Sequence, residues 1–237
     1  MTNNEILNAY VGDTQVAKIY LGTDIVWPTI PTDLIVTYNV TSTTKTTKIM
    51  TNTTPYLERI VLEDGTEIPL PTTGQAPWIY YRFSTTGLHT ARFIESKKGN
   101  IPSFDSCSAI TGVFIPEGYT KIGMGAFESC TGLTTIDIPN SVTAITDGAN
   151  FVYCGRLRTV NIGSGITVLG NQVFMGCSVL TAITINAVTP PQMGTGVLQS
   201  ANNAYFYVPD EAVEAYKAAP TWADYADRVK GISEKPQ

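Results

Sequence analysis

The chain has little of what most catalytic and metal sites require. Only one of its 237 residues is a histidine, His89, and only four are cysteines. Any catalytic triad would therefore depend on His89, and no two cysteines are spaced closely enough for a zinc site. Glycine-rich phosphate loops and hydrolase motifs are missing, and the scattered carboxylates form no pair suited to glycoside hydrolysis. We therefore expect no enzyme, no metal and no cofactor.

Charge and long apolar runs are also scarce. Charged residues make up 15% of the chain, its net charge is −5, and lysine and arginine form no block. A nucleic-acid partner is thus not expected. No apolar run is long enough to cross a membrane, so we expect no membrane insertion. The first residues show neither the basic nor the apolar region of a signal peptide, so export would need another route or a leader outside this sequence.

What the sequence does contain is a repeat. The motif F-x-x-C occurs four times, and its cysteines are separated by 23, 24 and 23 residues. A fixed period of this length is typical of a solenoid. Each unit opens with an L-x-x-I-x-I run, which predicts a short strand whose fourth and sixth residues point inward. The motif residues are Phe104 and Cys107, Phe127 and Cys130, Phe151 and Cys154, and Phe174 and Cys177.

The string IPEGYTKIGMGAFESCTGLTTIDIPNSVTAI resembles the BspA-type leucine-rich repeats, whose pattern is I-P-x-x-V-T-x-I-G-x-x-A-F-x-x-C. The resemblance covers roughly residues 88–209, with departures at Gly163, Thr146 and Val173. It implies that the phenylalanines and cysteines form a core ladder, in keeping with the usual burial of free cysteine. Disulfides between neighbouring units and a reactive thiol remain alternatives.

The third and fifth residues of each predicted strand should face outward. They would form a shallow, mostly neutral strip, with Phe114 as an exposed aromatic residue beside hydroxyl, amide and carboxylate groups. Extended solenoid faces commonly bind partners, and these groups suit a glycan or a protein loop; a merely solvated face is the alternative. The candidate binding residues are Phe114, Thr135, Asp137, Thr159, Asn161 and Thr184.

The N-terminal residues contain two copies of Y-[VL]-G-x-x-x-V, ten residues apart, each of which predicts a β-hairpin with its turn at the glycine. The segment resembles the opening of bacteriophage tail and head-fibre proteins, which implies docking on a virus particle. The candidate docking residues are Tyr10, Gly12, Tyr20, Gly22 and Trp27.

The predicted fold is mainly β. We expect an N-terminal hairpin segment at 1–31, a small β-sandwich-like module at 32–90, leucine-rich repeats at 91–209, and a helical cap and tail at 210–237. Within the cap, Asp210 should cap one short helix and Thr221 with Asp224 a second, with Pro220 between them.

Two functions fit these features, and both are non-enzymatic. The first is an attachment protein on the virion surface of a phage of gut bacteria, bound to other virion proteins through its N-terminus. Its repeats would bind a host-surface protein or glycan. The alternative is an extracellular adhesin of the BspA type on a bacterial cell surface; a carbohydrate-active enzyme is a remote third. Surface attachment favours a homo-oligomer, because several weak contacts gain avidity together.

The ladder hypothesis predicts that all four thiols resist a thiol reagent in the folded protein and react once it is unfolded. Buried thiols are shielded and remain protonated, whereas the reagent attacks the accessible thiolate. Counting modified cysteines by mass spectrometry, with and without denaturant, measures this. Rapid labelling of all four in the folded protein would contradict the ladder.

Overall fold

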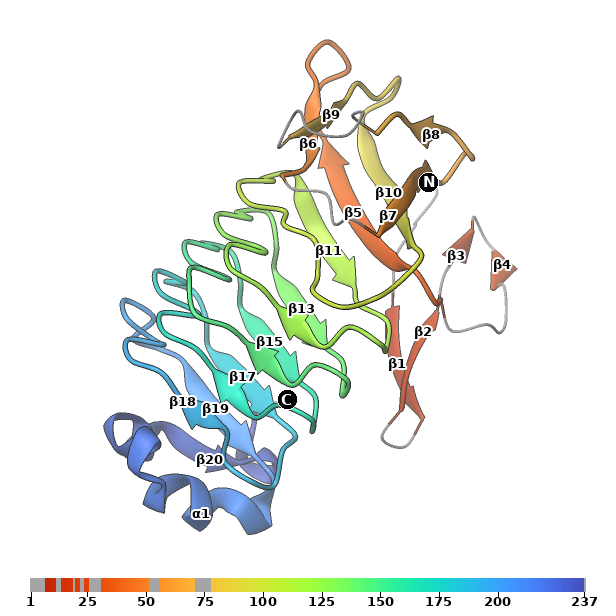
Figure 1. Ribbon diagram of the computed structural model, residues 1–237. Coiled ribbons are helices and arrows are strands. Elements are labelled where there is room, and N and C mark those ends of the chain that lie inside the picture. Colours follow the sequence, from red (N-terminus) through yellow and green to blue (C-terminus); the bar gives the residue numbers. More distant parts are fainter. Residues whose placement is uncertain are drawn as a thin grey trace.

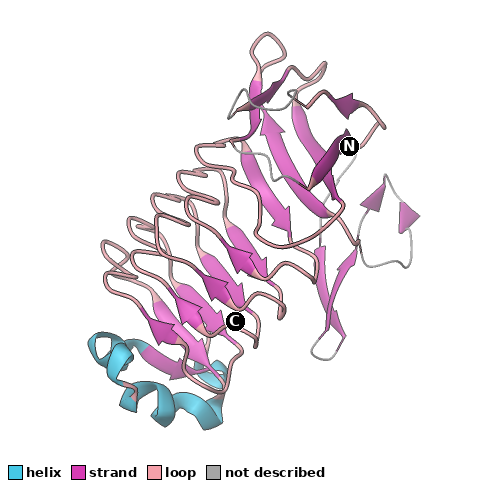
Figure 2. Ribbon diagram, viewed as in Figure 1, coloured by secondary structure: helices cyan, strands magenta, loops and turns pink. Residues whose placement is uncertain are grey.

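The computed structural model describes residues 7–11, 14–18, 20–21, 24–25, 31–51, 56–70 and 78–236. Up to residue 25 it describes the backbone alone. The described chain is mainly β, with strands stacked along its length and helices at the C-terminal end (Figure 1; Figure 2). This is the fold class that the sequence predicted.

The two N-terminal hairpins are confirmed at the level of the backbone. Strand β1 (Leu7–Val11) pairs antiparallel with β2 (Thr14–Lys18), and β3 (Tyr20–Leu21) pairs antiparallel with β4 (Asp24–Ile25). The candidate docking residues Gly12, Gly22 and Trp27 lie outside the described residues, and the side chains of Tyr10 and Tyr20 are not described. Their role in docking therefore stays a prediction.

One ten-stranded sheet joins the repeats to the module that precedes them. Its order is β20-β19-β17-β15-β13-β11-β5-β10-β7-β8. The strands from the repeats and cap are β11 (Ile110–Phe114), β13 (Thr135–Ile138), β15 (Thr159–Ile162), β17 (Ala182–Ile185), β19 (Tyr205–Val208) and β20 (Val229–Gly231). Those from the module are β5 (Leu34–Val40), β7 (Leu57–Leu62), β8 (Glu67–Ile68) and β10 (Gly87–Glu95).

The repeats have a second, shorter parallel sheet with the order β12-β14-β16-β18. Its two-residue strands are β12 (Lys121–Ile122), β14 (Ala144–Ile145), β16 (Val168–Leu169) and β18 (Gln192–Met193). Each of the four turns from β11 to β18 thus contributes one strand to each sheet, and the core lies between the sheets. The predicted inward residues of the L-x-x-I-x-I runs are buried, including Ile136, Ile138, Val160 and Ile162, except Val113, which is half-buried.

The junction between module and repeats differs from the expected boundary at residues 90/91. That boundary falls inside β10, which pairs antiparallel with both β5 and β7. Strand β5, not β10, lies beside β11, and it runs antiparallel to it. The unit that fitted the repeat loosely at residues 88–109 therefore supplies Phe104 and Cys107 to the core, while its strand lies elsewhere in the sheet.

The module has a second layer, as a sandwich-like arrangement requires. Strands β6 (Thr47–Met50) and β9 (Ile79–Tyr81) pair antiparallel in a sheet of their own. Their buried residues Ile49 and Ile79 join the same core as Tyr38 of β5. The Tyr38 hydroxyl donates to the backbone oxygen of Ile49 at 2.8 Å, which ties the two layers together.

Two ladders of side chains hold successive turns in register. The rings of Phe104, Phe127, Phe151 and Phe174 stack at centroid distances of 5.6, 5.3 and 5.4 Å. Beside them, each cysteine from Cys130 onward donates its thiol hydrogen to the backbone oxygen of the preceding unit's phenylalanine. The Sγ–O distances are 3.2, 3.1 and 3.0 Å for Cys130, Cys154 and Cys177.

The turn that carries each cysteine needs a left-handed backbone. The residue before it has a φ of 54° at Ser129, 59° at Tyr153 and 74° at Gly176. Only one of these is glycine, although other residues adopt this conformation at a cost of about 1 kcal/mol or more. The turn places phenylalanine and cysteine on the inner side, so the repeated packing compensates for the local strain.

The C-terminal cap closes the open end of the solenoid. It contains the 3₁₀ helices η1 (Asp210–Ala212), η2 (Pro220–Arg228) and η3 (Ile232–Glu234), the helix α1 (Val213–Ala218) and the strand β20. Trp222 is fully buried against Phe206, with ring centroids 4.9 Å apart, and donates its indole hydrogen to the oxygen of Pro191 at 2.8 Å.

The predicted capping residues form tertiary hydrogen bonds and do not cap the helices as predicted. Asp210 makes no side-chain cap bond to its helix and instead accepts hydrogen bonds from Ser233. The Thr221 hydroxyl accepts from the backbone of Met193, 28 residues earlier. The capping box with Asp224 is therefore wrong, because the segment is a 3₁₀ helix that begins at Pro220 and packs on the last repeat.

Replacing Phe127, in the middle of the stack, with alanine should lower the free energy of unfolding by about 3–5 kcal/mol, because the cavity lies between two ordered rings. Met124→Ala is the matched control three residues away: Met124 is 76% exposed, and its loss should change stability by less than about 0.5 kcal/mol. Urea unfolding followed by circular dichroism measures both; equal losses would contradict the ladder's role.

Candidate binding face

Parallel pairing places the outward residues of successive repeats in two rows. The threonine row consists of Thr135, Thr159, Ala182 and Tyr205; the aspartate row consists of Phe114, Asp137, Asn161, Thr184 and Tyr207. We call the two rows together the outer face. All six predicted binding residues belong to it, so the register brings them together as expected.

Hydrogen bonds run along both rows. The Thr159 hydroxyl donates to the Thr135 hydroxyl oxygen at 2.9 Å, and the Asn161 amide donates to an Asp137 carboxylate oxygen at 2.5 Å. Thr135 is exposed, and Thr159 and Asn161 are half-buried. These three side chains offer hydroxyl and amide groups to a ligand in a fixed arrangement, since each is already held by its neighbour.

The other half of the predicted strip is buried. Phe114 is 6%, Thr184 7% and Asp137 8% exposed, so the exposed aromatic residue expected at Phe114 is wrong. Phe114 lies opposite Ile35, across the β5–β11 pair, and Ile35 is 5% exposed as well. The N-terminal end of the outer face is therefore an apolar contact between module and repeats, and it cannot offer a stacking surface.

The C-terminal segment covers another part of the outer face. The Lys235 ammonium donates to the Thr184 hydroxyl at 2.8 Å, which explains why Thr184 is buried. Burial lowers the pKa of Lys235, and the Asp137 carboxylate acts in the opposite direction. Lys235 thus crosses the aspartate row and faces the only carboxylate in it.

The structure adds an aromatic and cationic group that the sequence analysis missed. Tyr205 is exposed at the end of the threonine row, and the Lys230 ammonium lies 4.6 Å from the centre of its ring. The signal was present: YFYV at 205–208 follows AITI at 182–185 by 23 residues, the period of the repeats. Tyr205 supplies the exposed aromatic group that Phe114 does not.

The four cysteines are free and buried, which is the ladder arrangement and not a disulfide framework. Burial raises the pKa of Cys107 and Cys177 to about 12, and it raises those of Cys130 and Cys154 as well. At neutral pH these thiols are not nucleophiles. In the described part of the chain, no three histidine, cysteine or acidic side chains are grouped so that they could hold a metal ion.

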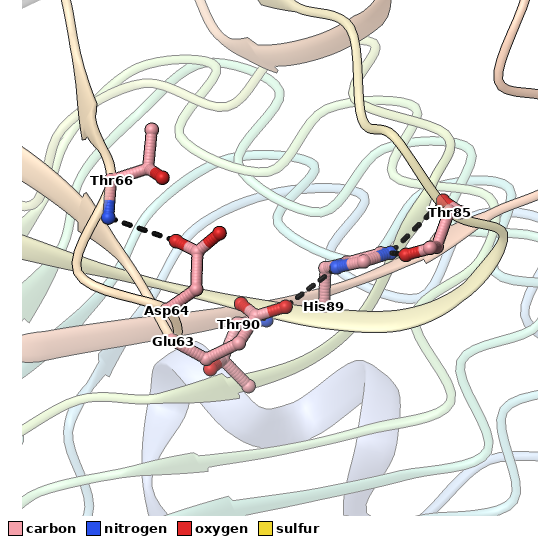
Figure 3. Close-up of polar contacts among 6 residues, drawn as sticks. All are labelled: Glu63, Asp64, Thr66, Thr85, His89 and Thr90. Atoms are coloured by element: carbon pink, nitrogen blue, oxygen red, sulfur yellow. Dashed lines mark hydrogen bonds and ion pairs between the residues drawn. The ribbon is translucent and has the colours of Figure 1, made fainter.

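His89 lies in a triad-like arrangement, shown in Figure 3. Its Nδ1 is 2.6 Å from Glu63 Oε1, and its Nε2 is 3.3 Å from the Thr85 hydroxyl. However, Nε2 lies closer, at 3.1 Å, to the backbone oxygen of Thr85, which is only an acceptor. Since Nε2 must donate its hydrogen to this oxygen, it has no lone pair with which to take a hydroxyl proton. The cluster therefore connects the turn after β7, strand β10 and the turn before β10, and it does not resemble an activated nucleophile.

One comparison with known families gives a match, and it falls on the repeats. Residues 100–217 match, in six copies, the family described as BspA type leucine rich repeat region. Residues 100–217 are BspA-type leucine-rich repeats. No curated protein matches the chain. The comparisons offer no support for a phage-like N-terminal segment. Among the described residues, no helix is both long and apolar enough to cross a membrane.

The BspA-type repeats typically serve as binding modules without catalysis, and the geometry of the outer face agrees with a binding or adhesion role. The six copies also extend beyond the F-x-x-C units. In the last turn Leu198 and Ala201 take the places of phenylalanine and cysteine, and both are buried. This unit keeps the ladder positions although its residues have changed.

Buried thiols make stability depend on pH. Their pKa values are raised above 9.0, so between about pH 9 and about pH 12 the unfolded chain loses protons that the folded chain keeps. Stability should therefore fall as pH rises, by up to about 1.4 kcal/mol per pH unit for each thiol.

The Cys177→Ala variant tests this directly, because Ala201 occupies the same place in the next unit. In urea unfolding with reductant above about pH 9, its free energy of unfolding should fall less steeply with pH than that of the parent protein. The difference in slope should be the contribution of one thiol, up to about 1.4 kcal/mol per pH unit. The buried tyrosines contribute equally to both proteins. Identical slopes would show that Cys177 ionises as readily in the folded as in the unfolded chain.

Proposed function

We propose that this protein is a non-enzymatic adhesin whose repeats present the outer face to a ligand on another surface. The observation that carries the proposal is the hydrogen-bonded pair Thr135–Thr159 with Asn161 beside it. These side chains are accessible, lie on rigid strands, and are oriented by each other rather than by solvent. A site of this kind loses little entropy when a ligand binds.

The chemistry of the outer face favours a neutral polar ligand, either a glycan or a polar protein loop. Thr135, Thr159 and Asn161 can donate and accept hydrogen bonds, and Tyr205 offers a ring face or hydroxyl at the C-terminal end. Lys235 and Asp137 face each other, so the aspartate row carries little net charge at its centre.

For the location, we propose a bacterial cell surface, where BspA-type repeat proteins usually act. This was the alternative to the virion surface, and the family match supports it better, because no finding supports a virion role. A homo-oligomer also belongs to the proposal, since weak single sites on a cell surface gain avidity by about 10²–10⁴ when several engage together.

A double variant on the outer face, Thr135→Lys with Thr159→Lys, should reduce adhesion about tenfold or more, because two bulky charges replace the hydroxyl ladder. Thr143→Lys with Thr167→Lys is the matched control. These threonines have the same 24-residue spacing and are exposed, but they lie beside β14 and β16 in the other sheet.

The measurement is the adhesion of protein-coated beads to epithelial cell monolayers and to a glycan array, with folding checked by circular dichroism. Equal adhesion by both double variants would place the binding site outside the outer face. Equal loss in both would indicate a general effect of positive charge.

A further inference from the structure

A second group of exposed aromatic residues lies in the module that precedes the repeats. Trp78 is 51% and Tyr80 53% exposed, whereas Ile79 and Phe83, on the opposite side of the same extended segment, are buried. Arg82 is exposed and continues the outward side. Strands β6 and β9 lie at the opposite end of the molecule from the helical cap (Figure 1). The residues Trp78, Tyr80 and Arg82 form what we call the β9 row.

The rings of Trp78 and Tyr80 are not part of the buried core. Tyr81 packs edge-on against Phe83 at 5.0 Å, and with Ile79 they supply the inward side of the segment. In the described part of the chain, the other tryptophan, Trp222, is fully buried and hydrogen-bonded. A half-exposed tryptophan beside a half-exposed tyrosine is costly to leave in water and is typical of a contact surface.

The two chain segments that form the β6–β9 sheet carry basic side chains and no carboxylate of their own, in a chain that is acidic as a whole. Residues 41–51 and 78–86 contain Lys45, Lys48 and Arg82 but no carboxylate, while the whole chain has a net charge of −5. Lys48 lies opposite Tyr80 across the β6–β9 pair, and its ammonium donates to the backbone oxygen of Asp105 at 2.6 Å. Arg82 and Lys45 are exposed. The Asp105 carboxylate, beyond Lys48, accepts from the Ser106 hydroxyl at 2.7 Å.

We propose that the β9 row is a second binding site, separate from the outer face, for an acidic polysaccharide made of uronic-acid sugars. Alternate residues of an extended strand lie ~7 Å apart, so the two rings can each stack on the apolar C–H face of a sugar along one chain. The Arg82 guanidinium can then bind a sugar carboxylate through two parallel hydrogen bonds.

The combination of flat rings with few cations separates this ligand from other anions. A nucleic acid or an anionic membrane is bound through many basic groups, and the β9 row offers too few of them. An acidic peptide would supply the charge but no rigid ring faces for Trp78 and Tyr80. A uronic-acid chain satisfies both requirements at once.

Binding of the full chain to polygalacturonate tests the proposal, with neutral dextran and polyglutamate as comparison polymers. Affinity electrophoresis should show retardation by polygalacturonate alone. Trp78→Ala and Arg82→Ala should each weaken this binding about tenfold or more, and added salt should weaken it further because a charge pair contributes. Tyr153→Ala, which removes an aromatic residue that is 56% exposed on a repeat, should leave it unchanged.

No retardation by polygalacturonate would overturn the proposal, as would an undiminished affinity in Trp78→Ala. Equal retardation by polyglutamate would show that charge alone is recognised, and equal retardation by dextran would show that Arg82 plays no part. The outer-face variant Thr135→Lys with Thr159→Lys should retain polygalacturonate binding through the β9 row. The two sites can thus fail independently, and Arg82→Lys, which keeps the charge, should recover only part of the binding.

Discussion

Stacking between turns is the constraint on which this structure depends. A unit of 23 or 24 residues cannot bury its own apolar face, so each turn must place its phenylalanine ring on the ring of the turn before. The cysteine thiols add a polar connection where a larger side chain would not fit, since each reaches the backbone oxygen of a neighbouring phenylalanine. The left-handed backbone at Ser129 and Tyr153 is tolerated because this packing holds it on both sides.

The same stacking determines what the protein can offer a ligand. Parallel strands in strict register turn single outward residues into continuous rows, so that Thr135 and Thr159 form one hydroxyl ladder although they are 24 residues apart. The rows end where segments from outside the repeats pack against them. At one end Phe114 packs beside Ile35 of an antiparallel strand, and near the other Lys235 lies over Thr184.

Residues that repeat could be placed from the sequence, and those whose surroundings come from outside the repeat could not. The period located Phe127 and Cys130 in the core because their neighbours are copies of themselves. The predicted exposure of Phe114 and Thr184 was wrong because residues far away in the sequence contact them. Ile35 lies 79 positions before Phe114, and Lys235 lies 51 positions after Thr184. The pairing of β5 with β11 could not be predicted either, because the alternation of apolar and polar residues indicates a strand but not which strand it pairs with. Asp210 and Thr221 were predicted to cap helices. Their side chains do accept hydrogen bonds, but from distant residues in tertiary contacts.

The closure of both ends has a consequence for how such a protein can change in length. Strand β5 runs antiparallel to β11 and blocks addition there, while Trp222 seals the far end against Phe206. New turns can therefore enter only between β11 and β19, where every neighbour is a copy of the insert. Gain or loss of whole turns in that interval would alter the reach of the outer face and leave the β9 row and the cap as they are. The two ends of the solenoid are therefore fixed, and the number of turns between them can vary.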